Sequence, residues 1–289
     1  MGTLRDTKRR ISGIQSTQKI TRAMKMVASA KLRRAQEGII NARPYAKKIS
    51  LLLNDLFSEG DINSSLFLKE REIKTALVVV VTSDKGLCGS FNTNLIKESV
   101  RVINEYKGKG ISPVLYCIGK KGYDFFSKRG YEIINHKIGI FAGLKNEIAL
   151  RIALEIITGY SDGKFDQVAI IYNEFKSVIQ QKIVQEQYLP IPMDKDKKKS
   201  KGSDNFLYEM KREEILSYVL PKHLNSQMWR VLLESNAAEL GAKMTAMENA
   251  TTNAQELIRA LKIKYNKERQ TAITKELIEV VSGANALRA

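Results

Sequence analysis

Apolar residues in the first 57 positions recur at the spacing of a long helix. Thr3 and Asp6 resemble a capping box at its start, and Pro44, which lacks a backbone N–H, should bend it locally. From Leu32 onward the apolar positions step strictly by three and four residues, which is the narrow seam of a coiled coil. This seam comprises Leu32, Ala35, Ile39, Ala42, Ala46, Ile49, Leu53 and Leu56. We therefore expect a coiled-coil helix over residues 1–58.

The seam is less regular nearer the N-terminus. Ile11 and Ile14 keep the same spacing, whereas Ile20, Met24 and Val27 shift it. Because a shift in the apolar repeat changes how a helix meets its partner, the sequence predicts a seam that is interrupted rather than uniform.

The last segment of the chain mirrors the first. No proline follows Pro221, and apolar or small residues recur at helical spacing up to Ala286. A helix of roughly 65 residues spans on the order of 100 Å, so another helix must support it. The helix of residues 1–58 is the partner of suitable length. We therefore predict a second helix over residues 211–289 and an antiparallel coiled coil between the two.

The interior of this second helix has an unusual composition. Residues 234–284 are rich in Ala, Thr, Asn, Ser and Met and contain few large apolar side chains. Such a helix can pack closely against a partner helix, but it has few large side chains with which to hold a protein that surrounds it. One interpretation is a weak coiled coil, and the other is a rod that moves inside another protein.

Between the helices, strand-like and helix-like segments alternate. Residues 76–82, 113–119 and 166–173 are apolar and rich in β-branched residues, as strands are. The helix-like segments are residues 93–106, 120–128 and 146–158, the last of them stopped by Gly159. This alternation is typical of a small, Rossmann-like α/β domain with a mainly parallel sheet, which we place at residues 74–209.

Two further segments complete this domain. Residues 177–189 alternate between apolar and polar side chains, as an edge or hairpin strand does. Residues 193–205, MDKDKKKSKGSDN, have the composition of a charged loop, and the short FLYE follows them. The fold class is therefore α/β, with a long antiparallel coiled coil of the terminal helices around a central Rossmann-like domain.

The charge of the chain is large and unevenly distributed. The net charge is +17, and residues 1–57 hold thirteen basic side chains against three acidic ones. This asymmetry predicts an acidic partner, which could be nucleic acid, an anionic membrane surface or a carboxylate-rich protein. A nucleic-acid-binding coiled coil therefore stays open, although the first aromatic residue that could stack on a base is Tyr45.

The segment SDKGLCGS, residues 83–90, follows the first strand and has the glycines of a phosphate-binding loop. Only two residues separate Gly86 from Gly89, however, and Ser90 follows without the lysine that a P-loop requires. The spacing of the dinucleotide-binding fingerprint is absent too. We favour a turn at the carboxyl edge of the sheet, and a nucleotide-binding, flavodoxin-like protein is the alternative.

A nucleophilic site is the second possibility in this loop. Asp84 and Cys88 lie close together, and a neighbouring base can activate a thiol. The usual base is histidine, but neither His136 nor His223 sits in a recognisable partner motif. The chain also has only one other cysteine, Cys117, and neither shows metal-ligand spacing. We therefore expect a buried structural Cys88 and predict no catalytic, cofactor-binding or metal-ligating residue.

Three long motifs, in order, resemble the gamma subunit of the F-type ATP synthase along essentially the whole chain. They are QSTQKITRAMKMVASAKLRRAQ with RPY near the N-terminus, SDKGLCGSFN in the centre, and LLES, MTAMENAT and YNKERQTAITKELIEVVSGA near the C-terminus. The resemblance implies the central rotor shaft of the ATP synthase complex, a bacterial-type subunit with no catalytic residue of its own. It also implies the ion transport and ATP synthesis that this complex carries out.

The resemblance further implies partners and the residues that meet them. The partners are the alpha and beta subunits of the catalytic hexamer, the epsilon subunit and the membrane c-ring. The positions that match a contact with beta-subunit loops are Met24, Lys25, Arg269, Gln270 and Thr274. Tyr208 and Glu209 match the region near the membrane ring and epsilon, whereas the lysine-rich loop of residues 195–201 has no family counterpart.

The same resemblance and the composition predict where the protein works. The cysteine-bearing regulatory insertion of chloroplast gamma subunits has no equivalent in the chain. No stretch approaches the ~18 apolar residues of a membrane span, and the N-terminus lacks the features of a signal or transit peptide. We expect a peripheral protein on the cytoplasmic side of the plasma (inner) membrane, with no direct span and no nucleic-acid partner.

Overall fold

The computed structural model describes residues 4–56, 66–69, 71–192 and 212–286. The chain divides into two compact units, which are described separately below. One contains residues 29–243, and the other pairs residues 1–28 with residues 244–289. Two long helices contribute to both units, α1 (Leu4–Leu56) and α5 (Arg212–Ala286). The first runs through Pro44 and the second through Pro221.

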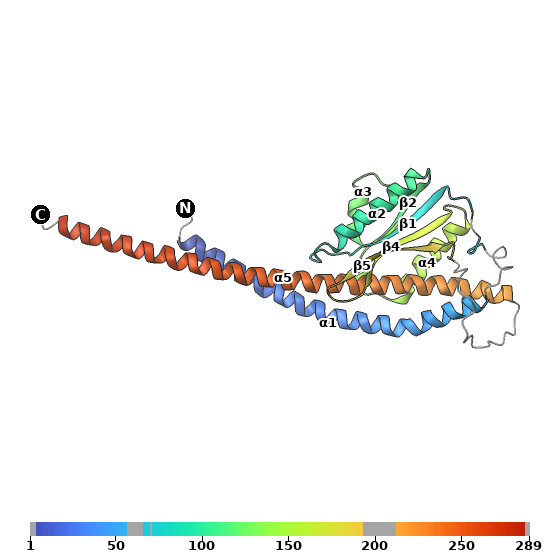
Figure 1. Ribbon diagram of the computed structural model, residues 1–289, viewed down its shortest axis with the longest axis horizontal. Helices are drawn as coiled ribbons and strands as arrows, with labels where there is room; N and C mark the ends of the chain where they lie inside the picture. The colour runs from blue at the N-terminus through green and yellow to red at the C-terminus, as the bar shows by residue number, and fades with distance from the viewer. Residues whose placement is uncertain (1–3, 57–65, 70, 193–211, 287–289) are drawn as a thin grey trace. The chain divides into compact units, whose positions relative to one another are not determined.

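The unit of residues 29–243 contains a five-stranded sheet in the order β3-β2-β1-β4-β5 (Figure 1). The pairs β1–β2, β1–β4 and β2–β3 are parallel, whereas β5 is antiparallel to β4. The strands are β1 (Thr75–Val81), β2 (Ser112–Ile118), β3 (Ile133–Lys137), β4 (Gln167–Phe175) and β5 (Gln181–Leu189). The predicted parallel sheet with an edge strand after it is confirmed, and β3 is a strand that the sequence pattern did not predict.

Helices cover both faces of the sheet because each strand buries alternate side chains on opposite sides. Ala76, Val78 and Val80 of β1 share a core with α2 (Phe91–Gly108) and α3 (Lys120–Ser127). Leu77 and Val79 of the same strand share the other core with α4 (Asn146–Ser161), the first turns of α5 and the end of α1. The short 3-10 helix η2 (Ile140–Ala142) precedes α4. Figure 1 shows these layers on the two sides of the sheet.

The expectation that Gly159 stops the fourth helix is wrong, because α4 continues to Ser161. A Cβ atom at position 159 would come within 2.8 Å of the Phe165 ring. The glycine therefore serves the close packing of Phe165, a fully buried side chain, rather than the end of the helix. The predicted domain limits of residues 74–209 stay a prediction, since residues 193–211 lie outside the described part of the chain.

The downstream part of the predicted α1 seam is buried except for the half-buried Ala42 and Ala46, and it meets two kinds of partner. Leu32, Ala35 and Ile39 pack against Leu233, Ala237 and Leu240 of α5, as a coiled coil would. The seam residues Ile49, Leu53 and Leu56 instead join the main core of the α/β domain. The end of α1 is therefore part of this domain's core.

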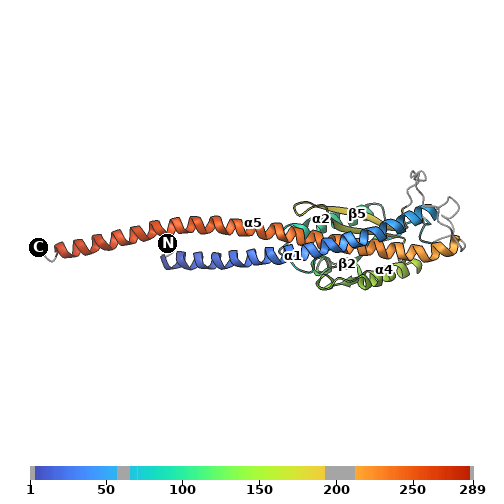
Figure 2. The same ribbon diagram turned by 90° about the horizontal axis from the view of Figure 1, so that it is seen from below.

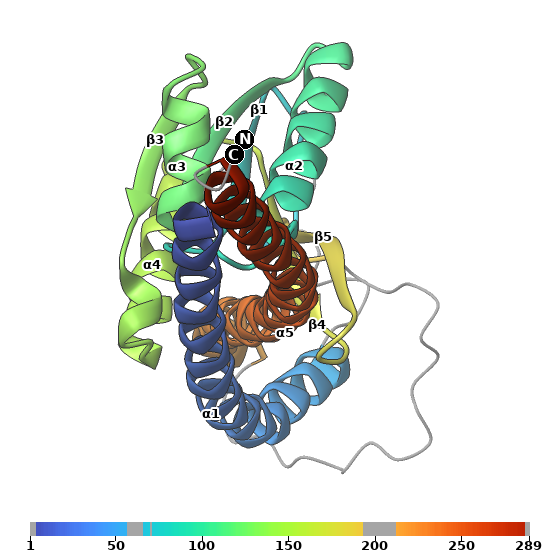
Figure 3. The same cartoon turned by 90° about the vertical axis from the view of Figure 1, so that its left-hand side faces the viewer.

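The second unit is an antiparallel helix pair, with the start of α1 beside the second half of α5 (Figures 2 and 3). The hydroxyl groups of Thr21 and Thr251 are 2.8 Å apart, and Lys25 forms an ion pair with Glu248. Thr7 donates a hydrogen bond to Glu268 over 3.2 Å. These three pairs run in opposite directions along the two helices, and the predicted fold class is confirmed.

The predicted interruption of the α1 seam is wrong. Ile20 and Val27 are 59% and 56% exposed, whereas Thr21 and Ala28, the residues that follow them, are buried. Together with Thr7 and Ile11 these buried positions continue the three-and-four spacing that begins at Leu32. The seam therefore keeps its register, and polar residues occupy some of its positions because they find partners on α5.

Candidate functional site

The loop after β1 lies at the carboxyl edge of the sheet, where α/β proteins commonly bind ligands. Asp84 accepts hydrogen bonds at one carboxylate oxygen from the backbone N–H of Lys120, over 3.1 Å, and of Gly139, over 2.8 Å. Lys120 is the first residue of α3, and the N-terminus of a helix is a position that favours a bound phosphate. The chain's own carboxylate therefore takes the place of an anionic ligand at this helix.

Side chains within the loop satisfy one another. The backbone N–H of Ser83 donates to the side-chain oxygen of Asn92 over 3.0 Å. The Asn92 amide in turn donates to Ser83 Oγ over 2.8 Å and to Cys88 Sγ over 3.2 Å. Leu87 and Gly89 have φ values of 65° and 58°, so the turn passes through the left-handed region twice. The favoured interpretation of a turn at the sheet edge agrees with this geometry.

Cys88 is a buried thiol, as expected from the sequence. Its side chain is 2% exposed and packs with Phe91 and Ala238. Burial raises the pKa of the Cys88 thiol. This effect is larger than that of the hydrogen bond with Ser83, which lowers the pKa. Because the thiolate is the nucleophilic form, this environment disfavours a reactive cysteine.

The order of the strands places the topological switch point between β1 and β4, and in open α/β sheets ligands bind in the crevice there. In this chain α5 fills that crevice. Glu234 accepts a hydrogen bond from the backbone N–H of Phe175, at the end of β4, over 3.0 Å. Ser235 lies 3.5 Å from the carbonyl oxygen of Val81, at the end of β1. One turn further on, Ala238 is completely buried, so the helix excludes a nucleotide from this position.

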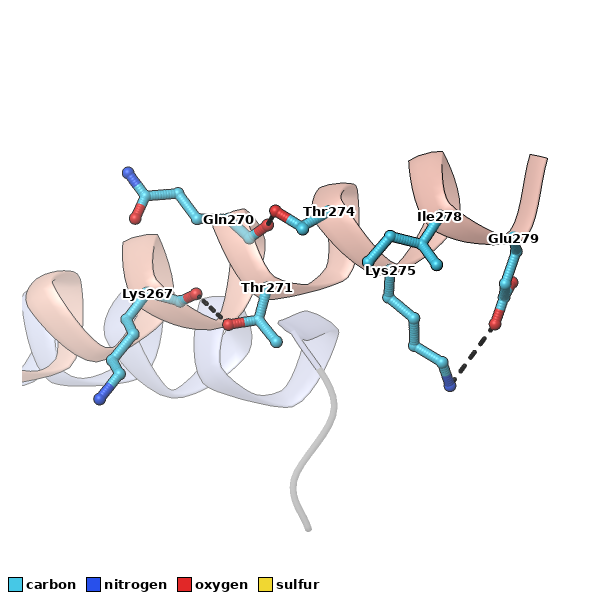
Figure 4. A pocket seen from close by; sticks show the side chains of 7 residues that line it. All are labelled: Lys267, Gln270, Thr271, Thr274, Lys275, Ile278 and Glu279. Atoms are coloured by element: carbon cyan, nitrogen blue, oxygen red, sulfur yellow. Dashed lines mark hydrogen bonds and ion pairs between the residues drawn. The ribbon is translucent and has the colours of Figure 1, made fainter. Parts of the chain in front are cut away.

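The predicted partner-binding residues near the C-terminus are exposed on the second half of α5. Arg269, Gln270 and Thr274 all face solvent. Gln270 and Thr274 help to line a shallow groove of about 590 Å³, and the side chains of Gln270 and Lys267 diverge above and below the helix in the view of Figure 4. The groove is lined by Lys267, Gln270, Thr271, Thr274, Lys275, Ile278 and Glu279. It runs along one helix and brings no catalytic set of side chains together.

The other predicted contact residues have a mixed outcome. Met24 and Lys25 are half-buried in the helix pair, and Lys25 already pairs with Glu248 of α5. Tyr208, Glu209 and the lysine-rich loop of residues 195–201 lie outside the described residues. Sequence reasoning also missed Glu234 and Ser235, because nothing local in the sequence indicates that a helix would enter the crevice.

Residues 4–56, 66–69, 71–192 and 212–286 contain no group of three or more His, Cys, Asp or Glu placed to hold a metal ion. Among the helices described there, none combines the length and the apolar character of a membrane span. The fold and the filled crevice together define the class of protein. It has a pair of long helices and an α/β domain, and one of its own helices closes the crevice in which such domains bind ligands.

Comparison with known proteins identifies the family. The model of a family described as ATP synthase matches residues 3–287. The ATP synthase gamma chains of Chlorobaculum parvum and Chlorobium phaeobacteroides are 49% and 47% identical, each over the full length of both chains. The chain belongs to the family of ATP synthase gamma chains. The family predicted from the three motifs is confirmed, and a gamma chain is a non-catalytic subunit of its complex.

Solved structures agree with the fold. A chain of the central stalk and c-ring structure of the Tetrahymena thermophila mitochondrial ATP synthase is 26% identical, with a TM-score of 0.62. The match covers 80% of this chain and 99% of that one. A chain of the Euglena gracilis mitochondrial ATP synthase, 20% identical, has a TM-score of 0.70 and covers 99% of this chain and 95% of its own. Because the Euglena chain is only 20% identical, its likeness supports the fold alone.

Proposed function

We propose that this chain is the central rotor shaft of an ATP synthase. In this role it couples ion flow through the membrane ring to ATP synthesis or hydrolysis in the alpha and beta subunits. The observation that carries the proposal is the match to gamma chains over the whole length of both sequences. The structural relative from Tetrahymena, described as a central stalk with its c-ring, supports the same role.

The closed crevice and the exposed end of α5 fit this role better than the alternatives. A flavodoxin-like nucleotide site needs an open switch point, which Glu234 and Ser235 fill. Beyond Glu268 the large apolar side chains that the structure describes on α5 are exposed, including Leu277 at 60% and Val280 at 70%. A partner protein that surrounds this segment would bury them, whereas the charged phosphate backbone that dominates nucleic-acid binding would leave them in contact with water. We therefore assign the surrounding partner as the hexamer of alpha and beta subunits.

The mechanism follows from differences between contacts. A shaft shifts a beta subunit between states only if it contacts the two states with different free energies. Arg269, Gln270 and Thr274 are exposed polar groups that can form such contacts with a beta-subunit loop. Exposed ion pairs contribute about 0.2–1 kcal/mol each, which is weak enough to be broken and remade at every rotational step. The basic side chains of residues 1–57 would act in this way on acidic beta loops.

The remaining partners and the location belong to the same proposal. Tyr208 and Glu209 would meet the membrane ring and the epsilon subunit, while Met24 and Lys25 would face beta-subunit loops. The chain would work as a peripheral subunit on the cytoplasmic side of a bacterial plasma membrane, as part of the membrane-associated complex. Crosslinking from cysteines placed at Tyr208 and Glu209 would test the ring contact, and crosslinks to the alpha subunit alone would refute it.

Reconstitution tests the proposed function directly. Alpha and beta subunits are mixed with or without this chain, and ATP hydrolysis is measured. We expect hydrolysis to rise when the chain is added, because its asymmetry makes the three beta sites differ. Equal hydrolysis with and without the chain would contradict the proposal.

The double variant Arg269→Ala with Gln270→Ala tests the beta-loop contact. We expect at least a threefold loss of ATP hydrolysis by the reconstituted complex, equivalent to about 0.7 kcal/mol or more in the barrier. The control is Gln255→Ala with Arg259→Ala, which removes the same two residue types from exposed positions on the same helix. Equal activity of the two double variants would remove the assignment of Arg269 and Gln270.

A further inference from the structure

A row of polar contacts joins α5 to the edge of the sheet, in addition to the apolar core between them. The Tyr188 hydroxyl donates to the carbonyl oxygen of Leu224 over 3.0 Å. Three residues further along α5, Gln227 donates to Glu186 over 2.7 Å. Seven residues beyond Gln227, Glu234 accepts the Phe175 N–H over 3.0 Å. These contacts repeat at helical spacing, so they follow one face of α5.

The centre of the row is an arginine held in two ways. Arg230 donates from Nη2 to both carboxylate oxygens of Glu186, over 2.6 and 2.8 Å. Its Nη1 donates to the hydroxyl of Tyr172 over 3.0 Å, and this hydroxyl donates to Glu186 over 3.1 Å. Glu186 lies on β5 and Tyr172 on β4, so one side chain of α5 is fixed to two strands. Charge-assisted hydrogen bonds of this kind have specific geometry as well as strength.

The pair is charged in the folded protein. Burial raises the pKa of Glu186, but the charge of Arg230 and hydrogen bonds from Arg230, Gln227 and Tyr172 outweigh burial and lower it overall. Burial lowers the pKa of Arg230, and the Glu186 charge more than reverses this effect. Both groups therefore keep the charges that their hydrogen bonds require.

Stability alone does not account for this arrangement. Leu224, Met228, Val231 and Leu232 of the same helix are completely buried in the main core and already hold α5 against the sheet. Apolar burial is non-directional, so it resists separation of the two surfaces much more than rolling or sliding of the helix. A half-buried ion pair adds little stability compared with apolar side chains of similar size, but it can fix one register.

We propose that Glu186 and Arg230, with Tyr172, Gln227 and Glu234, form a torsional lock between α5 and the α/β domain. The lock keeps the helix from rolling or sliding on the sheet when torque passes between them. It makes these side chains positioning residues for energy coupling, and this role rests on the proposed rotor function. The lock lies wholly within the unit of residues 29–243.

The test uses the complete ATP synthase in membrane vesicles, assembled with a variant of this chain. Glu186→Met with Arg230→Met replaces the pair with apolar side chains of similar length. We measure ATP hydrolysis and ATP-driven ion pumping in the same vesicles. We expect hydrolysis within twofold of the unmodified complex and at least a threefold lower ratio of pumping to hydrolysis, because a helix that slips turns without driving the ring.

Two further variants make the result specific. Arg230→Lys keeps the charge but cannot hold Glu186 and Tyr172 together in a planar fork, so we expect an intermediate ratio. Arg101→Met with Glu105→Met removes an Arg–Glu pair from the exposed face of α2, and we expect the ratio to stay unchanged. A slip caused by loss of any ion pair in the domain would lower the ratio in this control as well, which would overturn the proposal.

The remaining outcomes also decide the question. An unchanged ratio in Glu186→Met with Arg230→Met would overturn the lock. So would a parallel loss of hydrolysis and pumping with less chain in the purified complex, since that result indicates a purely structural pair. If the unmodified chain fails to restore pumping to a complex that lacks it, the rotor function falls and the lock falls with it.

Discussion

One residue at the carboxyl edge of the sheet, Gly119, cannot be replaced by a residue with a side chain without strain. Gly119 has a φ of 91°, and a Cβ atom there would come within 2.1 Å of the Thr82 carbonyl oxygen. Thr82 cannot move aside easily, because its N–H and its hydroxyl both donate to the carbonyl oxygen of Ile118. The hydroxyl also accepts the N–H of Gly122 at the start of α3. The turn from β2 into α3 therefore depends on a glycine at position 119.

We predict that Gly119→Ala lowers the free energy of unfolding by about 3 kcal/mol or more, because it adds both backbone strain and a clash. Chemical denaturation of the purified chain measures the change. Gly108→Ala is the matched control, since that glycine lies in α2 and its Cβ would meet nothing within 4 Å. There we expect a gain of up to about 1 kcal/mol. Similar losses in both variants would contradict the assigned role of Gly119.

The lowered pKa of Glu186 predicts a specific loss of stability in acid. The folded chain releases this proton more readily than the unfolded chain, whose ordinary value is about 4.5. Its contribution to stability is therefore complete above pH 4.5 and disappears as the pH falls through the lower, folded pKa. Arg230, Tyr172 and Gln227 form hydrogen bonds with Glu186. The charge of Glu186 also acts on His223, whose pKa it raises against the larger lowering by burial.

Denaturation at pH 6 and at pH 3.5 checks this prediction in the unmodified chain and in Glu186→Gln. We expect the variant to be less stable at pH 6, because Arg230 loses its charged partner. Between pH 6 and pH 3.5 the unmodified chain should lose more stability than the variant, so the two converge. Parallel losses would show that Glu186 does not titrate as its surroundings indicate.

At the scale of elements, the α1 seam shows that register and side-chain character can disagree. The apolar residues Ile20 and Val27 lie outside the seam, whereas the polar Thr21 lies inside it. Thr21 is tolerated there because its hydroxyl meets that of Thr251 at 2.8 Å. An apolar count cannot detect such a position, since the compensating partner is 230 residues away in the sequence.

We predict different costs for two isoleucines in the same helix. Ile11→Ala should destabilise the helix pair by about 2 kcal/mol, since Ile11 is buried against Ile258 and Leu261. Ile20→Ala should change stability by less than about 0.5 kcal/mol, because this side chain is 59% exposed. Thermal unfolding followed by circular dichroism measures both. Equal effects would restore the interrupted seam that the sequence indicates.

The sheet was predictable as far as burial marks its strands. β1, β2 and β4 are apolar runs because helices cover both of their faces, and the sequence identifies all three. The strand β3 lies at the edge and alternates between half-buried and exposed residues over IINHK, so its signal is weak. The buried Cys88 was predicted from local sequence, whereas the entry of α5 into the crevice depends on contacts such as Val81 with Ser235, 154 residues apart.

At the scale of the whole molecule, charge is the dominant feature. The net charge is +17, and basic side chains such as Arg9, Arg10 and Arg22 on α1 are exposed. Long-range attraction accelerates the encounter of oppositely charged proteins, and salt screens it. Short-range contacts, which determine how long the complex lasts, depend on salt much less.

We predict that association with the alpha and beta hexamer slows about tenfold or more between about 50 and 500 mM salt, because salt screens an electrostatic steering that typically raises association rates by about 10- to 1,000-fold. The dissociation rate should change much less. Stopped-flow fluorescence measures both rates. The variant Arg9→Gln with Arg10→Gln should show a shallower salt dependence, and a salt-independent association rate would refute steering by the basic helix.

The occupied crevice between β1 and β4 has a consequence for inhibition. A binding site whose occupant belongs to the same polypeptide has an effective concentration that dilution cannot lower. A free nucleotide or a small-molecule competitor would have to displace Glu234, Ser235 and Ala238 together with the helix that carries them. The α/β domain should therefore be insensitive to the nucleotides that open α/β sheets bind at this position, whatever their concentration.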